Sequence, residues 1–524
     1  MKTDSKAYLR YIPAVIIVAV YAALYAWCFD PKLDLNGDNA TYISLARNLA
    51  SGKGYSDLSF GGSYQPAIQF PPGYPFILSL MVRLGLDSLI AFKILNGFFL
   101  ILSVLLVFFL MRGITGRPIF ATVVALLCIT APRLLRFSMI AMSEMSYMLC
   151  VCLAFFALWR CSEGKGRWNA WFWIACVSAA ASYYIRGNGL SIMFAVVVFF
   201  LFRKEWKRAA VSAGVEAALI LPWIIRGRIV GSGSRYLDTI FVNNPWRPDD
   251  RQVQSVGDFL EKAWLNLYDT TLNGFRCVLF PGTGDSWSDY VAVPAVIIGI
   301  LILAVTAYGL WKMKPLNFAF LAFLLANTAF LMAWHSGNDY RYVTPYIPMV
   351  IAGFWYGVWR LLELFLKKPW PAVAVCALAL VPILLTIPKL KVAHRAGQSG
   401  YAPEYVYYFG LADKIESLNP EPGKVSPVTI CCRKPELFRY HAPSFYCCNY
   451  PYTADPGEMA RFFIDRKVGF VVLDMLGYSS TQLYLIPALG GMLDLLSTVS
   501  QGEDGSVVFA FDLLRAEEMF GTGN

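Results

Sequence analysis

Long apolar segments alternate with short basic loops along most of this 524-residue chain. A bilayer-spanning helix needs about 20 mainly apolar residues, and the chain has about eleven segments near that length. We expect helices near residues 11–28, 88–111, 118–132, 143–159, 169–185, 188–202, 209–225, 291–311, 316–334, 342–361 and 369–387. The segments 169–185 and 188–202 are short and nearly continuous. The pattern predicts a polytopic α-helical membrane protein.

The basic residues give these spans a direction. With a cytoplasmic N-terminus, every inner loop is short and contains Lys or Arg, as the positive-inside rule requires. These basic residues are Arg112, Arg117, Arg160, Lys165, Arg167, Arg203, Lys204, Lys207, Arg208, Lys312, Lys314, Lys367 and Lys368. The first apolar segment resembles the core of a secretory signal peptide, but its length and the absence of a following small-x-small cleavage site favour a signal anchor.

Three regions then lie outside the membrane: 29–87, 226–290 and the part after residue 389. In the first region, Asn36-Gly37 is a turn signal. Asp38 or Asn39 can cap a helix over 40–51, whose apolar positions recur at helical spacing. Residues 54–72 form a Gly-, Ser- and Pro-rich loop. The apolar segment 74–86 is too short to span a bilayer, so we expect it to lie in the interface.

The C-terminal part, 390–524, has the composition of a small α/β domain. Residues rich in Val, Ile and Phe predict strands at 424–431, 468–474 and 506–511, with helices at 459–466 and 481–496 between them. The predicted domains are therefore a transmembrane domain, 1–389, with outer loops 29–87 and 226–290, and a soluble extracytoplasmic domain, 390–524.

Composition narrows the function classes. The chain is 57% hydrophobic and 15% charged, whereas a soluble domain has about 25% charged residues. Its formal net charge of +10 is spread over the loops between apolar segments. This distribution is typical of membrane topology signals and excludes a concentrated nucleic-acid-binding face.

The cysteines fall into two groups. Those in apolar segments are interpreted as buried hydrophobes. Cys431-Cys432 and Cys447-Cys448 lie in the polar C-terminal part and lack the C-x-x-C spacing of a zinc site. We predict a disulfide joining these two pairs if the domain lies in an oxidising compartment.

Charged residues at the outer ends of the spans are the candidates for chemistry, because charge at membrane depth is costly. They are Asp38, Arg133, Arg136, Glu144, Arg186, Arg226, Asp339 and Arg341. Carboxylates can deprotonate a hydroxyl group, and arginines can bind phosphate through two hydrogen bonds. Together they suit a substrate whose phosphate is attached to a membrane lipid.

Structural explanations remain open for the same residues. Asp38 can simply cap its helix, and Glu144 can simply pair with Arg133 or Arg136. Arg186 and Arg341 can extend their charged ends toward the membrane surface. Asp339 can close a turn, and His335 can be a polar residue at a helix end.

Several motifs resemble, in order, those of the GT-C glycosyltransferase superfamily, in particular its bacterial protein-mannosyltransferase and aminoarabinose-transferase-like branch. The first-loop sequence 36–49, NGDNATYISLARNL, followed by Gly52-Lys53-Gly54-Tyr55, is similar to the branch's first-loop signature. The further matching pieces are Pro71-Pro72-Gly73-Tyr74-Pro75, Ser143-Glu144, Tyr184-Ile185-Arg186, Pro222-Trp223-Ile224-Ile225-Arg226 and Arg341-Tyr342 with Pro345 and Pro348. The soluble C-terminal part also matches the branch.

The resemblance implies the GT-C fold and a reaction. An acceptor hydroxyl or amine attacks the anomeric carbon of a sugar carried on a polyprenyl phosphate or diphosphate, and the lipid phosphate leaves. Asp38 and Glu144 are then the catalytic candidates. Arg186, Arg226, Arg341 and Tyr342 are candidates for binding the donor phosphate. The further substrate-site candidates are Asn39, Tyr42, Arg133, Arg136, His335 and Asp339.

The resemblance implies no firm cofactor. Many members of the branch have a second acid beside the first-loop aspartate, but Asn39 follows Asp38 here. A divalent cation therefore stays an open alternative, since such a site usually has more oxygen ligands. The implied partners are a polyprenyl-phosphate-linked sugar, membrane lipid and a protein, glycan or lipid acceptor. We expect no nucleic-acid partner.

The implied location is the bacterial plasma (inner) membrane, with a cytoplasmic N-terminus and an extracytoplasmic C-terminal domain. Two function classes compete with a transferase of single sugars. One is an O-antigen-ligase-like or oligosaccharide-transferring enzyme, and the other is a transporter of lipid-linked sugars. Transporters often have internal repeats and broken helices at the membrane midplane. The sequence has no evident repeat and has a globular C-terminal part, which favours the transferase.

Overall fold

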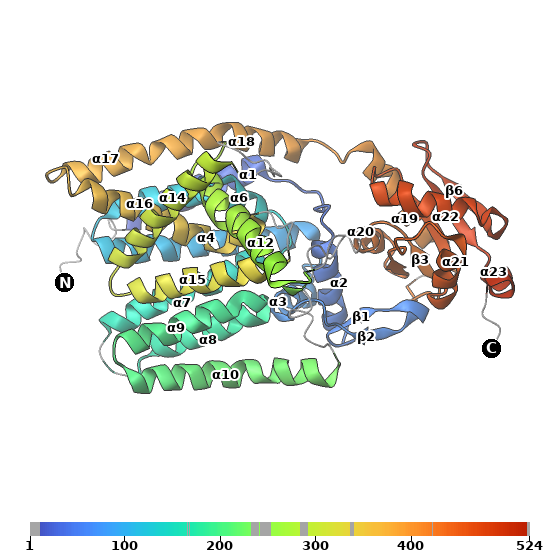
Figure 1. Cartoon of the computed structure of the whole chain (residues 1–524), viewed down its shortest axis with the longest axis horizontal. Helices are drawn as coiled ribbons and strands as arrows, with labels where there is room; N and C mark the ends of the chain where they lie inside the picture. Colours follow the sequence, from blue (N-terminus) through green and yellow to red (C-terminus); the bar gives the residue numbers. More distant parts are fainter. Residues whose placement is uncertain are drawn as a thin grey trace. The chain divides into compact units, whose positions relative to one another are not determined.

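The computed structural model describes residues 11–164, 166, 168–231, 240–241, 253–282, 292–335, 340–421 and 423–520. These residues are mostly helical and form two compact units (Figure 1). Unit 1 comprises residues 1–31, 68–74 and 88–398, and unit 2 comprises residues 32–67, 75–87 and 399–524. Each unit is considered by itself below.

A helix occurs at every position where the sequence predicts an apolar span. In chain order these are α1 (Ile12–Cys28), α4 (Leu89–Thr115), α5 (Pro118–Thr130), α7 (Glu144–Glu163), α8 (Ala170–Ile185), α9 (Leu190–Phe202), α10 (Trp206–Ile229), α14 (Val293–Lys312), α15 (Asn317–Ala333), α16 (Ile347–Leu362), and α17 (Trp370–Leu378) with α18 (Leu380–Gln398). The prediction works because each span is a local apolar run between helix-ending signals. In α4, for example, the Ser88 side chain accepts from the Ala91 N–H, and Gly116 ends the helix in the left-handed conformation.

Fewer of these helices are long and apolar enough to cross a bilayer alone. Among the described residues five satisfy both conditions: α4, α7, α10, α14 and the helical stretch that begins at Trp370. The bent pair of α5 and α6 (Pro132–Ser138), whose axes differ by 61°, adds a sixth only if the two helices form one span. Helices α1, α8 and α15 and the stretch Gly187–Phe202 are apolar but shorter. Unit 1 is therefore a helical membrane domain, and the count of about eleven crossings stays a prediction.

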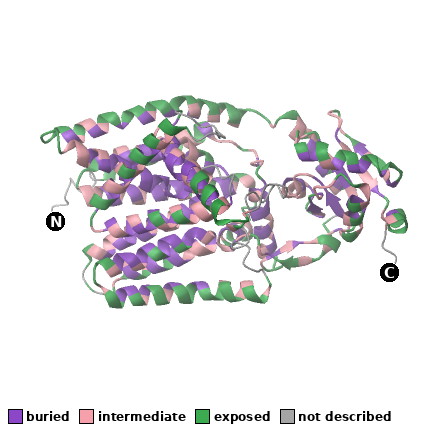
Figure 2. Cartoon of the chain, in the orientation of Figure 1, coloured by how far each residue is buried: buried purple, intermediate pink, exposed green. Residues whose placement is uncertain are grey.

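The outer helices of unit 1 carry apolar side chains on their exposed surface. Figure 2 shows that α10, α17 and α18 are largely exposed. Leu221 and Ile225 on α10 are 50% and 47% exposed, and Leu384 on α18 is 62% exposed. Such apolar faces suit hydrocarbon better than water. This pattern supports an integral membrane protein.

Close helix packing holds the interior of unit 1 together. Helices α7, α8, α9 and α10 lie side by side in Figure 1. Helices α14 and α16 approach closely at three glycines, because a Cβ on Gly309 would overlap the Gly353 carbonyl oxygen and one on Gly357 would overlap the Val305 carbonyl oxygen. Small residues at a crossing allow this approach, which is the usual way membrane helices associate.

Two helical segments of unit 1 were not predicted. Helix α6 follows Ala131 directly, and Pro132 is its first residue. Helix α12 (Val256–Leu267), the π-helical turn η4 (Tyr268–Leu272) and α13 (Asn273–Leu279) occupy part of the region expected as the outer loop 226–290. Ser255 and Asp258 form a capping box at the start of α12. This signal is readable in the sequence and was missed.

Most of the first outer region belongs to unit 2. Its helix α2 (Asp38–Ala50) begins two residues before the predicted helix, and its N-cap is Gly37 without a side-chain cap hydrogen bond. The prediction that Asp38 or Asn39 caps this helix is therefore wrong. Both residues lie inside the first turn because Gly37 adopts φ 93°, a conformation that glycine tolerates best. The expected loop also contains a hairpin of β1 (Ser56–Leu58) and β2 (Tyr64–Pro66), followed by α3 (Gly73–Arg83).

The C-terminal part of unit 2 contains a five-stranded mixed sheet of order β4-β3-β5-β7-β6. The predicted strands are β3 (Thr429–Cys431), β5 (Val468–Leu473) and β7 (Val507–Phe511), whereas β4 (Tyr446–Cys448) and β6 (Leu496–Gln501) were missed. Strand β3 is parallel to β4 and β5, and β7 is antiparallel to β5 and β6. The predicted helix 481–496 ends early, because η6 (Thr481–Leu485) and α22 (Ile486–Gly490) lead through η7 (Leu493–Leu495) into β6.

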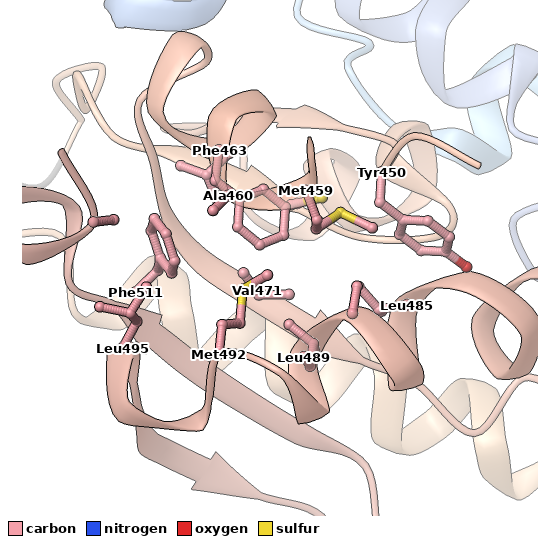
Figure 3. Packing of buried hydrophobic residues seen from close by; sticks show 14 of the residues in the cluster. Tyr450, Met459, Ala460, Phe463, Val471, Leu485, Leu489, Met492, Leu495 and Phe511 are labelled. Carbon is pink, nitrogen blue, oxygen red and sulfur yellow. The ribbon is translucent and has the colours of Figure 1, made fainter. Parts of the chain in front are cut away.

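Helices pack on this sheet to form a hydrophobic core. Helix α21 (Pro456–Asp465) contributes Met459 and Phe463, which lie with Val471 of β5, Leu489 of α22 and Phe511 in one cluster (Figure 3). The other helices of this part are α19 (Pro403–Ser417), α20 (Pro435–His441) and α23 (Leu513–Phe520). The α/β character of the C-terminal part thus follows from apolar strands buried under amphipathic helices.

The first outer region also packs against the C-terminal part within unit 2. Arg439 of α20 forms an ion pair with Asp57 of β1, with Nη1 2.9 Å from Oδ1. The Leu33 N–H donates to the Tyr401 hydroxyl at 2.7 Å. The division by contacts therefore groups residues 32–67 with residues 399–524, whereas the sequence groups them with the transmembrane domain. The division into a transmembrane domain, 1–389, and a soluble extracytoplasmic domain, 390–524, stays a prediction.

Candidate functional site

A buried carboxylate with two arginines is the main polar cluster of unit 1. The Glu144 side chain is fully buried, and its Oε1 lies 3.0 Å from both Arg186 Nη1 and Arg341 Nε. Arg186 also donates to the Ser143 hydroxyl at 2.9 Å, and its guanidinium lies 5.8 Å from the centre of the Tyr342 ring. Four candidates from distant parts of the sequence are thus brought together.

The Glu144 carboxylate is shared by two guanidinium groups. The Arg186 and Arg341 side chains retain 14% and 23% exposure. The second carboxylate oxygen, Oε2, has no hydrogen-bond partner among the described residues. Arginines held by a buried acid with part of their surface exposed are suited to bind an anionic group.

Three backbone segments position these side chains. Glu144 is the first residue of α7, Arg186 follows the end of α8, and Arg341 lies in the 3₁₀ segment η5 (Tyr340–Tyr346). The segment containing Gly73 also approaches here, because a Cβ on Gly73 would lie 2.7 Å from the Tyr184 carbonyl oxygen. The motifs that carry the family resemblance therefore include helix ends and turns of unit 1.

A second basic site in unit 1 surrounds a pocket of about 150 Å³. Arg133 and Arg136, both on α6, line it with Lys389 of α18. Its remaining walls include Phe137, Val278 and other apolar side chains. Sequence reasoning missed Lys389. The available signal was a basic residue beyond the outer end of the last predicted span, where the positive-inside rule requires none.

The partners of Glu144 correct one alternative. Its ion pairs are with Arg186 and Arg341, not with Arg133 or Arg136 as the structural alternative proposed. Helix ends that are distant in the chain meet here, whereas Arg133 and Arg136 line the pocket beside Lys389.

Asp38 belongs to unit 2, where it is the first residue of α2 and is half-buried. A carboxylate in the first turn of a helix is stabilised by the positive end of the helix dipole. Asn39 and Tyr42 are buried on the same helix, at 0% and 4% exposure. A Cβ on Gly37 would lie 3.3 Å from Glu436 Oε2, so the start of α2 is packed closely against α20.

The remaining candidates are Arg226, His335 and Asp339. The Arg226 guanidinium lies 4.9 Å from the ring centre of Trp223, one turn earlier on α10. His335 is buried, with its ring 5.4 Å from that of Trp334. Asp339 lies outside the described residues, so its predicted role is not addressed.

The four cysteines predicted to form a disulfide are free thiols. Strand register places Cys431 opposite Cys448 and Ile430 opposite Cys447, so the two pairs do meet across adjacent strands. Burial raises the pKa of the Cys431 thiol, and the neighbouring Cys448 thiol makes a smaller contribution in the same direction. Protonated, buried thiols behave as small hydrophobes. The disulfide is therefore not seen, although the pairs lie together as predicted.

Within the part of the chain that the structure describes, no group of three His, Cys, Asp or Glu side chains is arranged to hold a metal ion. The acids considered above are separated between the two units or are paired with arginine. The described residues therefore identify no ligands for the divalent cation that the sequence left as an alternative.

Comparisons with known proteins agree with this architecture. Residues 62–225 match the sequence profile of the family described as dolichyl-phosphate-mannose-protein mannosyltransferase. No curated protein matches the chain. Among solved structures, ArnT from Cupriavidus metallidurans bound to undecaprenyl phosphate is similar, with a TM-score of 0.57, 15% identity, and coverage of 97% of this chain and 98% of that one.

Two further solved structures share the fold. The oligosaccharyltransferase AglB from Archaeoglobus fulgidus, in complex with an inhibitory peptide and a dolichol-phosphate, has a TM-score of 0.60 and 12% identity over 96% of this chain and 75% of that one. The arabinofuranosyltransferase AftD from Mycobacteria has a TM-score of 0.51 and 13% identity over 95% of this chain and 41% of that one.

The fold and the matched profile indicate the class of protein. They agree with the predicted resemblance to the GT-C superfamily. The profile match over residues 62–225 also supports the predicted class of function, an integral-membrane glycosyltransferase that uses a lipid-linked sugar donor. The ligase-like and transporter alternatives are not favoured by these matches.

Proposed function

We propose that this protein transfers a sugar from a polyprenyl phosphate or diphosphate to an acceptor on the outer side of the membrane. The acceptor is a hydroxyl or amine of a protein, a glycan or a lipid. The observation that carries the proposal is the Glu144 cluster, in which one buried acid holds two partly exposed arginines in a membrane domain. Such a cluster supports binding of the donor's phosphate, and charged groups at membrane depth are retained mainly for function.

The arginines are assigned to the leaving group. When the acceptor oxygen or nitrogen bonds to the anomeric carbon, the bond from that carbon to the phosphate oxygen breaks, and negative charge grows on the phosphate. Arg186 and Arg341 stabilise that charge, because fixed guanidinium groups near a developing anion lower the barrier. Glu144 then acts as a positioning residue, since both arginines share its Oε1.

The pocket lined by Arg133, Arg136 and Lys389 is assigned to binding the lipid phosphate. It would hold this group either before the sugar is transferred or after the lipid phosphate has left the sugar. Arg133, Arg136 and Lys389 provide positive charge next to apolar walls. An amphipathic ligand needs both kinds of surface. Tyr342 supports the first cluster through its contact with Arg186, and Arg226 remains a candidate for the donor at the end of α10.

Asp38 is assigned as the general base that takes the proton from the acceptor. Its support comes from its place at the start of α2, where Gly37 and the α20 side chain Glu436 fix the helix end. A base must be held in place and remain accessible, and Asp38 is half-buried rather than enclosed. Asn39 and Tyr42 are proposed to support the substrate on the same helix. His335 and Asp339 remain predicted substrate-site residues.

The proposal is tested by the substitution Asp38→Asn in a reconstituted transfer assay with purified full-length protein. We expect transfer to fall by about a hundredfold or more, because a positioned base contributes 10²–10⁴ in rate. Asp34→Asn is the matched control, since Asp34 is the acid nearest to Asp38 along the sequence. The Asp34 carboxylate accepts the Asn36 N–H at 3.0 Å. Near-normal transfer by Asp38→Asn, with the melting temperature unchanged, would refute the assignment.

We also propose that the protein resides in a bacterial plasma membrane, with its N-terminus in the cytoplasm and the C-terminal domain, residues 390–524, outside. Support comes from the basic inner loops and the apolar exposed helices of unit 1. This orientation places the acceptor chemistry in the extracytoplasmic compartment.

A further inference from the structure

Unit 2 contains a cavity of about 500 Å³ that the proposed chemistry does not use. Helix α2, the end of α3, the β1–β2 hairpin and α20 all contribute to its walls. Every lining residue belongs to unit 2. A volume of this size is typical of a site for a small ligand or a few sugar units.

The cavity has an excess of positive charge. Four cationic side chains line it, Arg47, Lys53, Arg83 and Arg439, against the two acids Asp87 and Glu436. Arg47 pairs with Asp87 at 3.0 Å, and Arg439 pairs with Asp57 at 2.9 Å.

Lys53 and Arg83 have a different environment. The Lys53 ammonium donates to the Tyr64 hydroxyl at 2.6 Å, and the Arg83 guanidinium donates to the Leu49 carbonyl oxygen at 3.1 Å. Within the described part of the chain, neither forms an ion pair with a carboxylate. Two cations on the wall of one cavity that form no ion pair among the described residues are suited to an anion.

The remaining lining indicates that the anion belongs to a sugar. The rings of Tyr64 and Tyr440 lie on the cavity wall, and each has a cation over one face, with Lys53 Nζ 4.3 Å and the Arg47 guanidinium 5.7 Å from the respective ring centre. Aromatic faces combine an apolar surface with a polar edge, which suits the faces of a sugar ring. Ser44, Asn48 and Ser51 add side chains that can donate to or accept from hydroxyl groups. A bare anion would use the cations but not this aromatic and polar wall.

We propose that this cavity binds an anionic saccharide, as the docking site for a charged part of the acceptor. The identification of the ligand as acceptor rests on the proposed transferase function, but its binding does not require transfer. Lys53 and Arg83 contact the anionic group. Tyr64, Tyr440 and the small polar side chains contact the sugar ring.

The test measures binding by the full-length protein in lipid nanodiscs without any donor. The probes are trigalacturonate, neutral maltotriose as its uncharged counterpart, and inorganic phosphate as a free anion. We expect trigalacturonate to bind at least about tenfold more tightly than either of the others. The double variant Lys53→Gln/Arg83→Gln should then lose about tenfold in affinity for trigalacturonate, because two charge-assisted hydrogen bonds are removed.

The matched control is Lys414→Gln/Arg461→Gln, which removes the same charges from exposed positions of unit 2 outside the cavity. Arg461, like Arg83, donates to a backbone carbonyl oxygen: its Nε lies 3.2 Å from the Gly457 carbonyl oxygen. Wild-type affinity in this control and reduced affinity in the cavity variant support the proposal. A charge reversal, Lys53→Glu, should abolish binding.

Equal affinity of the wild type and the cavity variant for trigalacturonate overturns the cavity assignment. If inorganic phosphate binds as tightly as trigalacturonate, the identification of the ligand as a saccharide is overturned. Neither result depends on transfer activity, which is measured separately with Asp38→Asn. Absence of transfer by the wild-type protein, together with cavity-dependent binding, would refute the transferase and leave the saccharide site standing.

Discussion

Glu144 is the residue whose contacts most change its interpretation. From the sequence it is one acid at a helix end, with both a catalytic and a structural explanation. In the structure it is fully buried between two arginines. This geometry supports the proposed positioning role, because both arginines share its Oε1.

We predict that Glu144→Gln weakens use of the lipid donor by at least about tenfold in KM and lowers the melting temperature. Removing one partner of a buried ion pair costs about 3–5 kcal/mol, and here two guanidinium groups lose the same partner. The control is Glu163→Gln on the same helix, whose pair with Arg160 is exposed and should be worth less than about 1 kcal/mol. If Glu144→Gln depends on donor concentration as the wild type does, Arg186 and Arg341 do not need the Glu144 carboxylate to bind the donor.

Asp474, at the end of β5 in unit 2, gives a prediction about pH. It is 4% exposed, and its Oδ2 has no hydrogen-bond partner among the described residues. Burial raises the pKa of Asp474 above its ordinary value. The folded state therefore holds this proton more tightly than the unfolded chain. The stabilisation is complete below the unfolded pKa, about 4, and is lost as the pH rises through the raised pKa.

Asp474→Asn should accordingly raise the melting temperature at neutral pH and reduce its fall between about pH 4 and neutrality. The amide has no charge to bury, so the pH-dependent penalty disappears. Thermal unfolding of the full-length protein across this pH range checks the prediction. Asp465→Asn, at an exposed position nearby, should follow the wild-type curve, and a parallel shift of both variants would contradict the explanation.

At the scale of elements, glycines determine how closely the membrane helices approach. The contact between α14 and α16 leaves no room for a methyl group at Gly309. A sequence can reveal a glycine in an apolar span but not whether a neighbouring backbone lies against it. Gly214 in α10 looks similar in the sequence, yet a Cβ there would have no other atom within 4 Å.

We therefore predict opposite effects of the same substitution at these two positions. Gly309→Ala should force α14 and α16 apart and lower the melting temperature, since overpacking typically costs about 1–3 kcal/mol. Gly214→Ala should be neutral or stabilising, because alanine favours a helix interior more than glycine does, by about 1 kcal/mol. Thermal unfolding in detergent compares them. Equal effects would show that the α14–α16 contact is not limiting.

At the scale of the whole molecule, the topology remains the main prediction. An odd number of crossings with a cytoplasmic N-terminus puts the C-terminal part outside. We expect a reporter that is active only outside the cytoplasm to be active when fused at the C-terminal end, and inactive when inserted between Gly116 and Arg117. A cytoplasmic signal from the C-terminal fusion would rule out the eleven-span arrangement.

The sequence by itself determined where the apolar helices lie and the class of fold, and it indicated a class of enzyme. The apolar spans and the basic loops are local patterns, and lipid requires a helix to satisfy its own backbone hydrogen bonds. A short continuous run therefore predicts its own structure, as α4 and α7 illustrate. The ordered motifs around Asp38, Glu144, Arg186 and Arg341 were also sufficient to indicate a superfamily.

Only the tertiary structure decided which of these residues meet. Glu144 and Arg341 are 197 residues apart, and no local pattern specifies such a pair. The same is true of the contact between Asp57 in the first outer region and Arg439 in the C-terminal part. Strands β4 and β6 were missed for a related reason, because their hydrogen-bond partners lie on other strands. Periodicity depends on neighbours along the chain, whereas a binding site depends on neighbours in space.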